Sequence, residues 1–402
     1  MAAVGLAAFC IGAQAADVEW IGGSGSWTSG ANWSLGHPPV TGDLARFSVA
    51  SGSYVVLVDT NPSLLGIVVS GSAAWTWTNA AATVTSGSFG FSYHNSSTGT
   101  WAVRLAGPGG LTVSNGLLVL SVSNAFSGVT SVGGGGTLRM ASSGALGATS
   151  NVMVGAGGML ELAAGVGAVS RPLMLSGYGV ASNGALRSSS GTNAWNGNVT
   201  LSADAGIGVA AGTLTVGGAI SGPGQLTKLG AGQLTLNAAN TFSGGMALAG
   251  GTVAINGENR LGVTDAPIFF QGSATLLGTA NITLSAGRTV TIQTNAVAGF
   301  DGTVTWVVSG PIVGPGGLLK KGSGKLTLAG ANTYSGGTTV SNGVLEIGNG
   351  GTAGTLPGDV VNFATLLFNR ADAWTYAGSI GGTGAVIKAG AGAPIGLPKQ
   401  SA

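Results

Sequence analysis

Charged residues are scarce in this sequence, and their scarcity limits the kind of protein it can be. Asp, Glu, Lys and Arg make up 6% of the 402 residues, against about 25% in an average soluble domain. Exposed helix faces need such residues, so the composition argues against a helical fold. The hydrophobic fraction of 44% can build a core, which argues against a disordered chain. The polar surface must come from Ser, Thr, Asn and Gly, which suit strands and turns.

Basic residues and long apolar runs are also few. The 14 Lys and Arg exceed the 12 Asp and Glu by only two charges, and they form no basic stripe, so the sequence predicts no nucleic-acid partner. The densest basic cluster is Lys320, Lys321 and Lys325, which we interpret as solvent-exposed turn positions. No segment beyond the N-terminus approaches the roughly 18 apolar residues of a membrane span. We therefore predict no span.

Cysteine occurs once, as Cys10, within the apolar stretch MAAVGLAAFCIGAQA. Residues 1–15 resemble a signal peptide. No Lys or Arg precedes the apolar run, and a truncated start would explain this departure from the usual pattern. Ala13 and Ala15 form a small-x-small cleavage pattern before Ala16. The alternative is an apolar first strand. If cleavage occurs, the mature chain is secreted and has no cysteine for disulfides.

Glycine is abundant, with 77 residues, and it marks an internal repeat. One copy begins at Gly222 (GPGQLTKLGAGQLTLNAANTFSGG), and a second begins 92 residues later at Gly314 (GPGGLLKKGSGKLTLAGANTYSGG). A more diverged copy begins at Gly107, and a truncated one begins at Gly382. Repetition of this kind is typical of solenoids, in which neighbouring repeats stack to bury a common core.

Each copy contains strand and turn patterns. Leu226, Leu234 and Leu236 alternate with polar residues, so we expect strands with these side chains pointing inward, in parallel coils of about 20 residues. A block Asn-x-aromatic-Ser-Gly follows, in which the Asn suits a turn and the aromatic ring suits a core corner. The residues to which we assign a structural role in the repeat are Asn124, Phe126, Gly128, Lys228, Asn240, Phe242, Gly244, Lys320, Asn332, Tyr334 and Gly336.

A shorter element follows each copy at a similar distance. It reads Ala145-Leu146-Gly147 after the first copy and Arg260-Leu261-Gly262 after the second. After the third copy it reads Thr355-Leu356-Pro357-Gly358.

The block Gly-x-Leu-x-Lys-x-Gly-x-Gly-x-Leu-x-Leu…Ala-Asn-Thr-Tyr/Phe-Ser-Gly-Gly resembles the passenger-associated transport repeat, also called the autotransporter-associated β-strand repeat. The resemblance is close at 222–256 and 314–348, partial at 107–140, where Val113 replaces the Lys, and fragmentary at 382–392. It implies a right-handed parallel β-helix in a secreted passenger at the bacterial cell surface, with an outer-membrane translocation barrel as partner. It implies no catalytic residue and no cofactor.

The segment 16–100 differs from the rest by carrying five of the nine Trp and both His. We interpret it as a Trp-rich N-terminal β cap, because the open end of a solenoid must be covered. The solenoid proper would then span 101–402. The alternative is a carbohydrate-binding platform in which Trp20, Trp27 and Trp33 stack on sugar rings.

Candidates for catalysis are few. The sequence has only two histidines, His37 and His94. Few residues are therefore available for a Ser-His-Asp triad or a zinc site. Glu258 with Asp265, or Asp359 with Asp372, could serve as the acid and base of a glycosidase. Local turn capping explains these acids more simply, and no repeat spacing brings two of them together.

The sequence therefore predicts an all-β, right-handed parallel β-helix or β-solenoid with a Trp-rich cap. Its predicted function is that of a non-catalytic secreted surface or passenger protein, whose repeats form a scaffold for display, adhesion or assisted autotransport. Two alternatives remain: a β-helical polysaccharide lyase or hydrolase, and a protein that binds cell-surface glycans through its N-terminal segment.

Overall fold

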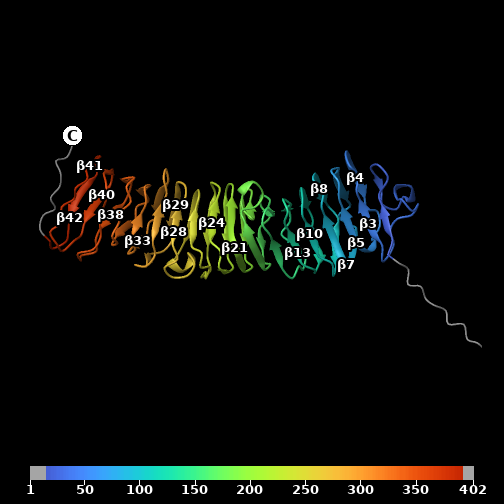
Figure 1. Ribbon diagram of the computed structural model, residues 1–402, viewed down its shortest axis with the longest axis horizontal. Coiled ribbons are helices and arrows are strands. Elements are labelled where there is room, and N and C mark those ends of the chain that lie inside the picture. Colours follow the sequence, from blue (N-terminus) through green and yellow to red (C-terminus); the bar gives the residue numbers. More distant parts are fainter. Residues whose placement is uncertain (1–14, 393–402) are drawn as a thin grey trace, which may run out of the picture.

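The chain forms an elongated rod of stacked coils (Figure 1). This computed structural model describes residues 15–392. It is all-β, with 45% strand and 2% helix, and its parallel strands form a β-solenoid of about 16 turns. The predicted fold class is confirmed. The described part of the chain contains no helix of sufficient length and apolarity to cross a membrane.

The strands belong to three sheets, joined by turns and by three short 3-10 segments, η1 (Gly30–Asn32), η2 (Val180–Ser182) and η3 (Glu258–Arg260). The first sheet contains β1 (Asp17–Glu19), β2 (Gly25–Ser26), β3 (Leu44–Phe47), β4 (Ser53–Leu57), β5 (Ser63–Val69), β6 (Ala74–Thr78), β7 (Thr83–Tyr93), β8 (Thr98–Trp101), β9 (Arg104–Gly107), β10 (Leu111–Val113), β11 (Leu117–Leu120), β12 (Ala125–Phe126), β13 (Thr130–Val132), β14 (Thr137–Met140), β15 (Val152–Val154), β16 (Met159–Leu162), β18 (Leu173–Gly177), β19 (Leu186–Ser188), β21 (Val199–Val209), β23 (Ile220–Ser221), β24 (Leu226–Leu229), β26 (Met246–Leu248), β28 (Ile268–Phe270), β31 (Val290–Ile292) and β34 (Ile312–Val313). The second contains β17 (Ala168–Val169), β20 (Thr192–Trp195), β22 (Thr213–Val216), β25 (Gln233–Leu236), β27 (Gly251–Ile255), β29 (Ala274–Gly278), β32 (Val297–Asp301), β35 (Gly317–Lys320), β37 (Thr338–Val340), β39 (Val360–Asn362) and β41 (Ile380–Gly381). The third contains β30 (Ile282–Leu284), β33 (Thr305–Val308), β36 (Lys325–Leu328), β38 (Val344–Ile347), β40 (Thr365–Phe368) and β42 (Ala385–Lys388).

Each coil pairs in parallel with the next. In the first sheet Leu111 pairs with Thr130, which pairs with Val152, which pairs with Leu173. These partners lie 19 to 22 residues apart, as expected for coils of about 20 residues. The pairing continues through residue 100, because β7 pairs with β10 and β8 pairs with β11. The Trp-rich segment and the repeat-bearing segment therefore share one stack.

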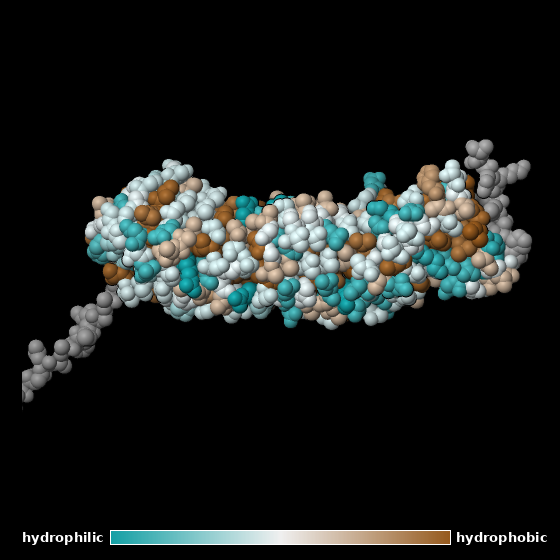
Figure 2. Space-filling view, turned by 180° about the vertical axis from the view of Figure 1, so that it is seen from behind, coloured by the Kyte–Doolittle hydropathy of each residue, from teal (hydrophilic) through white to brown (hydrophobic). Residues whose placement is uncertain are grey.

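Alternating side chains fill the interior of the rod. Leu226, Leu234 and Leu236 are all buried, as the period-two pattern predicted. Buried apolar residues form one continuous cluster from Val18 to Ile380. The face of the rod seen in Figure 2 is dominated by residues of intermediate hydropathy, with the larger apolar patches near the two ends. This surface fits a composition rich in Ser, Thr and Gly.

Aromatic rings close the N-terminal end. Phe47 lies among five tryptophans, with ring centroids 5.1–6.1 Å from those of Trp20, Trp27, Trp33, Trp75 and Trp77. Trp20 and Trp33 also form an isolated antiparallel bridge. Edge-to-face ring pairs such as Trp20 with Trp33 stabilise this cluster beyond the effect of burial alone.

Candidate functional site

The asparagine of the repeat block connects three consecutive coils. The Oδ1 atom of Asn240 accepts the backbone N–H of Ile220 at 2.8 Å, and its Nδ2 donates to the carbonyl of Arg260 at 2.7 Å. Ile220 lies one coil before Asn240 and Arg260 one coil after. We call this arrangement, an asparagine side chain bonded to the backbone of the coils on both sides, the asparagine clamp.

The same clamp occurs in the other two copies. Asn124 accepts the Leu105 amide at 2.8 Å and donates to the Ala145 carbonyl at 2.6 Å. Asn332 accepts the Ile312 amide at 2.9 Å and donates to the Thr355 carbonyl at 2.8 Å. The residues that accept these bonds, at positions 145, 260 and 355, belong to the short element that follows each repeat. Placing these asparagines at turns did not identify their partners on the neighbouring coils; Asn124 also donates to the Val122 carbonyl of its own turn, at 3.4 Å.

The aromatic residue of each block lies next to the clamp. Phe126, Phe242 and Tyr334 are each at most 2% exposed. The Leu of the following element is buried as well, at Leu146, Leu261 and Leu356. A Cβ added at Gly262 would lie 2.8 Å from the Phe242 ring, so the next coil packs directly on this ring. The Tyr334 hydroxyl also bonds Thr338 Oγ1 at 2.6 Å.

The final glycine of each block allows adjacent coils to approach closely. A Cβ at Gly244 would lie 2.4 Å from Gln225 N, and one at Gly336 would lie 2.4 Å from Gly316 C. At Gly128 it would lie 2.4 Å from Gly110 N. No larger residue fits without moving the backbone of the preceding coil. These glycines therefore set the spacing at which the clamp can form.

The lysine two residues after the first leucine of the repeat does not lie at the surface in the two close copies. Lys228 is 0% exposed, and its Nζ donates to the carbonyls of Leu229, Gly230 and Gly250 at 2.7–3.3 Å. Lys320, which is 2% exposed, donates in the same way to Gly322 and Asn342 at 2.8 and 3.1 Å. The interpretation of Lys320 as a solvated turn residue was wrong. These ammonium groups satisfy carbonyls at a buried corner.

In the same cluster, Lys325 forms an ion pair with Glu346 at 2.7 Å. Lys388, in the truncated copy, donates to the Arg370 carbonyl at 3.3 Å.

Burial of these lysines predicts a dependence of stability on pH. Burial lowers the pKa of Lys228 to about 8 from an ordinary value of 10.5. Between these values the unfolded chain binds more protons than the folded one, so stability should rise as the pH increases. We expect wild type to gain on the order of 1–3 kcal/mol relative to Lys228→Met over this range, measured by urea unfolding at pH 7.5–10.

The comparison with the variant removes the opposing effect of buried tyrosines. Burial raises the pKa of Tyr376 to about 12, and it also raises the pKa values of Tyr93 and Tyr334. Stability from these groups is lost as the pH rises through and above 10. The variant keeps all three, so only the lysine contribution differs. If the free energy of unfolding changed with pH in the same way in wild type and in Lys228→Met, the proposed burial of the Lys228 charge would be contradicted.

Two of the candidate acids meet, contrary to expectation. The Ser285 hydroxyl lies 2.8 Å from Glu258 Oε1 and 2.7 Å from Asp265 Oδ1. The same Glu258 oxygen accepts bonds from the Ser285 amide and from Nε of the fully buried Arg288. Burial alone would raise the pKa of Glu258, but these bonds outweigh it and hold the pKa below its usual value. A glycosidase acid requires the opposite shift.

The other candidate pair has different partners. Asp359 accepts the Ser379 amide of the next coil at 2.8 Å, and this bond lowers the pKa of its carboxyl. Asp372 is paired with Arg370 at 2.7 Å, which lowers its pKa too. The expectation of local turn capping was wrong for Asp265 and Asp359, because their bonds cross between coils.

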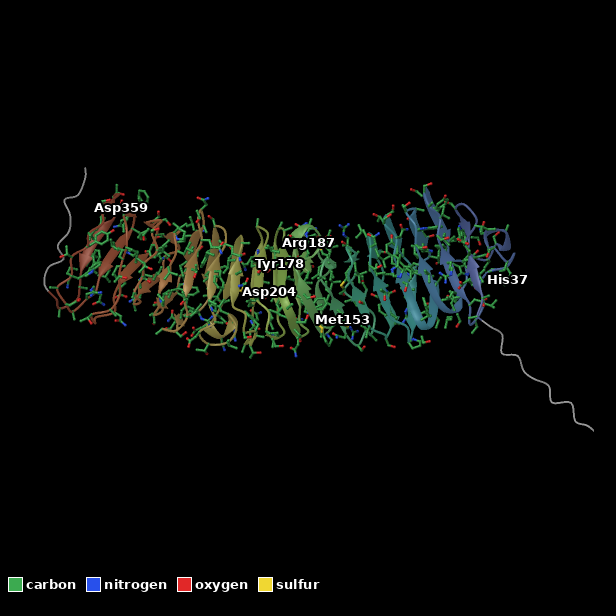
Figure 3. The ribbon with its side chains drawn as sticks, viewed as in Figure 1. His37, Met153, Tyr178, Arg187, Asp204 and Asp359 are labelled. Atoms are coloured by element: carbon green, nitrogen blue, oxygen red, sulfur yellow. The ribbon has the colours of Figure 1, made fainter. Side chains whose placement is uncertain are left out.

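The remaining candidate residues are the two histidines and the alanines of the predicted cleavage site. His37 lies at the opposite end of the rod from Asp359 (Figure 3), and His94 Nδ1 contacts Ser114 Oγ. Among residues 15–392 no three His, Cys, Asp or Glu side chains are close enough to hold a metal ion. Ala13 lies outside the described residues, Ala15 is exposed and Ala16 packs against the core. Cleavage between Ala15 and Ala16 stays a prediction.

The three tryptophans proposed to stack on sugars cannot do so in this fold. Trp20, Trp27 and Trp33 are at most 1% exposed. Their indole faces pack on each other and on Phe47 instead of facing solvent. Any glycan site at this end must therefore use other surfaces.

Comparison with known proteins connects the clamp to a described repeat. The family model of the passenger-associated transport repeat matches residues 114–140, 226–255 and 318–347, and each range contains one clamp asparagine and its aromatic neighbour. The chain is also similar to the adhesin BmaC autotransporter of Brucella suis biovar 1 (strain 1330), with 38% identity over 174 residues. That match covers 43% of this chain and 5% of the relative. No solved structure matches the chain.

Proposed function

Because this chain carries three passenger-associated transport repeats, we propose that it is a non-catalytic passenger segment displayed at a bacterial cell surface. Its role is that of an extended scaffold for adhesion, exported through an outer-membrane translocation barrel. The observation that carries this proposal is the recurrence of the clamp in each repeat. A clamp that recurs in three copies and joins neighbouring coils each time serves the stack.

Two further observations support a passenger role. The similar protein from Brucella suis is described as an autotransporter adhesin, and this chain spans only a small part of that protein's length. The rod is also built from successive coils, each paired with its neighbours. Such a body can be extended or shortened by whole coils without a change of architecture. A surface scaffold benefits from this property because its length sets how far it reaches.

Export can be tested by surface accessibility. The 402-residue chain would be placed between a cleavable secretion signal and a translocating β-barrel, with an epitope tag before residue 16. We expect whole-cell antibody labelling and removal of the tag by external protease. A matched fusion carrying Asn240→Leu and Asn332→Leu should label less, because both clamps are lost. Complete retention of the unmodified fusion inside the cell would contradict the passenger proposal.

The enzymatic alternative requires a separate test. Purified chain would be assayed for release of reducing ends or unsaturated products from a panel of bacterial and plant polysaccharides. We expect no turnover above that of buffer, because Glu258 is held ionised and Asp372 is paired with Arg370. Turnover that disappears on replacement of Glu258, Asp265, Asp359 or Asp372 would show that the protein is an enzyme.

A further inference from the structure

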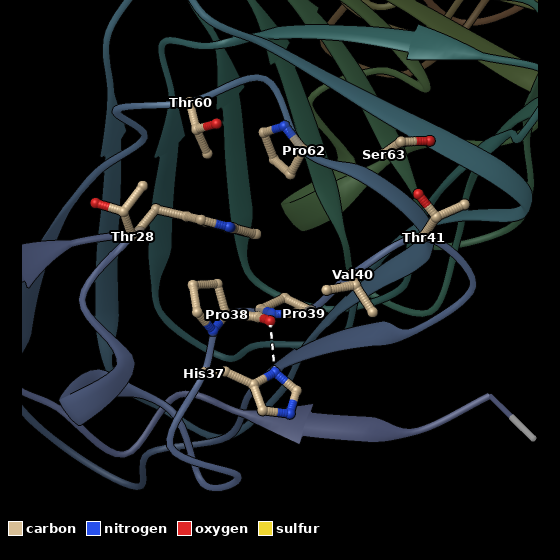
Figure 4. Close-up of a pocket in the computed structure, with 10 residues that line it drawn as sticks. Thr28, His37, Pro38, Pro39, Val40, Thr41, Thr60, Pro62 and Ser63 are labelled. Atoms are coloured by element: carbon tan, nitrogen blue, oxygen red, sulfur yellow. Dashed lines mark hydrogen bonds between the residues drawn. The ribbon is translucent and has the colours of Figure 1, made fainter. Parts of the chain in front are cut away.

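A hollow of about 420 Å³ opens near the N-terminal end of the rod (Figure 4). Its floor is apolar and buried, formed by Trp27, Pro39 and Pro62, and its rim is exposed and carries His37, Thr41 and Thr60. The volume falls within the range of about 300–1,000 Å³ that is typical of ligand sites. Most of the lining comes from two loops, one between η1 and β3 and the other between β4 and β5, and Trp27 and Thr28 come from the turn between β2 and η1.

Both loops are held in place independently of any ligand. The Asp43 carboxylate, 7% exposed, accepts the amide of Val40 at 3.0 Å and that of Ala16 at 3.1 Å. In the second loop the Pro62 carbonyl accepts the Thr85 amide at 2.9 Å. Pro38, Pro39 and Pro62 further restrict the backbone, because proline fixes its φ angle. The site is preformed, so a ligand would not have to order it.

A second hollow lies beside the first. It has a volume of about 130 Å³ and shares Thr60, and Asp59, Asn61 and Asn79 line it. Burial would raise the pKa of Asp59, but bonds from Ser26 and Thr28 outweigh this effect and hold the pKa below its usual value. The Asp59 carboxylate is exposed, so it is an acceptor at the surface of this hollow. We call the two hollows together the N-terminal groove.

The chemistry of the N-terminal groove selects one class of ligand. The partly exposed Pro38 and the exposed Val40 offer apolar surface for the C–H faces of sugars, and the threonine, asparagine and aspartate groups can bond hydroxyls. Neither hollow is lined by Lys or Arg, which a sulfate, phosphate or uronate would need as a partner. The charge of Asp59 also repels such anions. We propose that the N-terminal groove binds a neutral oligosaccharide.

This inference deepens the proposed adhesive role and rests on it, since it identifies the class of surface molecule to which the scaffold adheres. It replaces the interpretation in which Trp20, Trp27 and Trp33 form an exposed stacking platform. In the N-terminal groove only Trp27 takes part, as a buried floor. The rim hydroxyls and Asp59 supply the polar contacts.

The test measures binding of defined oligosaccharides to the full chain by isothermal titration calorimetry. The probes are hexasaccharides of β-1,4-glucose, β-1,4-mannose, β-1,4-N-acetylglucosamine and α-1,4-galacturonate, together with a decaproline peptide. Thr60→Trp is designed to fill the groove from its exposed rim, where the added ring need not disturb the core. Thr283→Trp, at an exposed position of β30, is the matched control.

We expect at least one neutral hexasaccharide to bind, and Thr60→Trp to weaken that binding at least about tenfold, or ~1.4 kcal/mol. Thr283→Trp should leave it unchanged. The proposal is overturned if no neutral hexasaccharide binds at millimolar concentration, if galacturonate or decaproline binds more tightly, or if Thr60→Trp has no effect. Thr60→Trp should still reach the cell surface in the fusion described above, so failure here is distinguishable from failure of the passenger proposal.

Discussion

Phe242→Ala is expected to lower the free energy of unfolding by about 3–5 kcal/mol, the usual cost of truncating a buried aromatic ring. The Phe242 side chain is 0% exposed, and the following coil packs directly against it at Gly262. The surrounding backbone is fixed by inter-coil hydrogen bonds and cannot collapse into the cavity. Urea unfolding would measure the loss. Because each coil contacts only its neighbours, the coils around residues 222–262 should open first.

Tyr334 offers a matched control for this prediction. Tyr334→Ala should cost a similar amount, since this ring is also fully buried. Tyr334→Phe keeps the ring and removes only the bond to Thr338, so we expect a loss of no more than about 1.5 kcal/mol. The other two copies already carry Phe at this position. Equal losses for the two Tyr334 variants would mean that the hydroxyl, and not the packed ring, stabilises the corner.

Asn240→Leu is expected to destabilise the protein by about 2–4 kcal/mol, because it leaves a buried amide and a partly buried carbonyl without partners. The Ile220 amide loses its acceptor and the Arg260 carbonyl loses a donor. Leucine branches at the same carbon and has the same number of side-chain heavy atoms, so the change in shape is small. Urea unfolding of the variant and of Asn124→Leu would be compared. The smaller effect is expected at Asn124, which is only partly buried.

Asn240→Asp provides a sharper control. At neutral pH its carboxylate can accept the Ile220 amide but cannot donate to the Arg260 carbonyl. Protonation restores the donor, so the pKa of this carboxyl should be raised in the folded state. Stability should therefore be present at low pH and lost as the pH rises through that pKa. A variant as unstable at pH 4 as at pH 7 would contradict the clamp.

The strands and the stack could be predicted because their signals are local or repeated. The alternation of Leu226, Leu234 and Leu236 is visible in a few residues, and it identifies one buried face. The burial of Lys228 was missed, although the same pattern could have revealed it. Lys228 stands two residues after Leu226, and Lys320 stands two residues after Leu318, so each lysine shares the inward face of its strand.

The partners of the clamps and the N-terminal groove were not accessible from the sequence. The clamp of Asn332 reaches residues 312 and 355, and these distances depend on the length of each coil, which varies with its loops. The meeting of Glu258 and Asp265 at Ser285 depends on the same variation. The N-terminal groove needs segments from two neighbouring coils. Its Trp27 was assigned to the cap, with an exposed stacking platform as the alternative, because tryptophan suits both places.

The central claim is that each repeat holds three consecutive coils together, and amide hydrogen exchange tests it most directly. The amides of Leu105, Ile220 and Ile312 each bond to the asparagine of the following coil. In Asn240→Leu the Ile220 amide should exchange at least about tenfold faster, matching a local loss of ~1.4 kcal/mol or more. The Leu105 and Ile312 amides should keep their wild-type protection. Unchanged exchange at Ile220, or equal acceleration at all three amides, would contradict the claim.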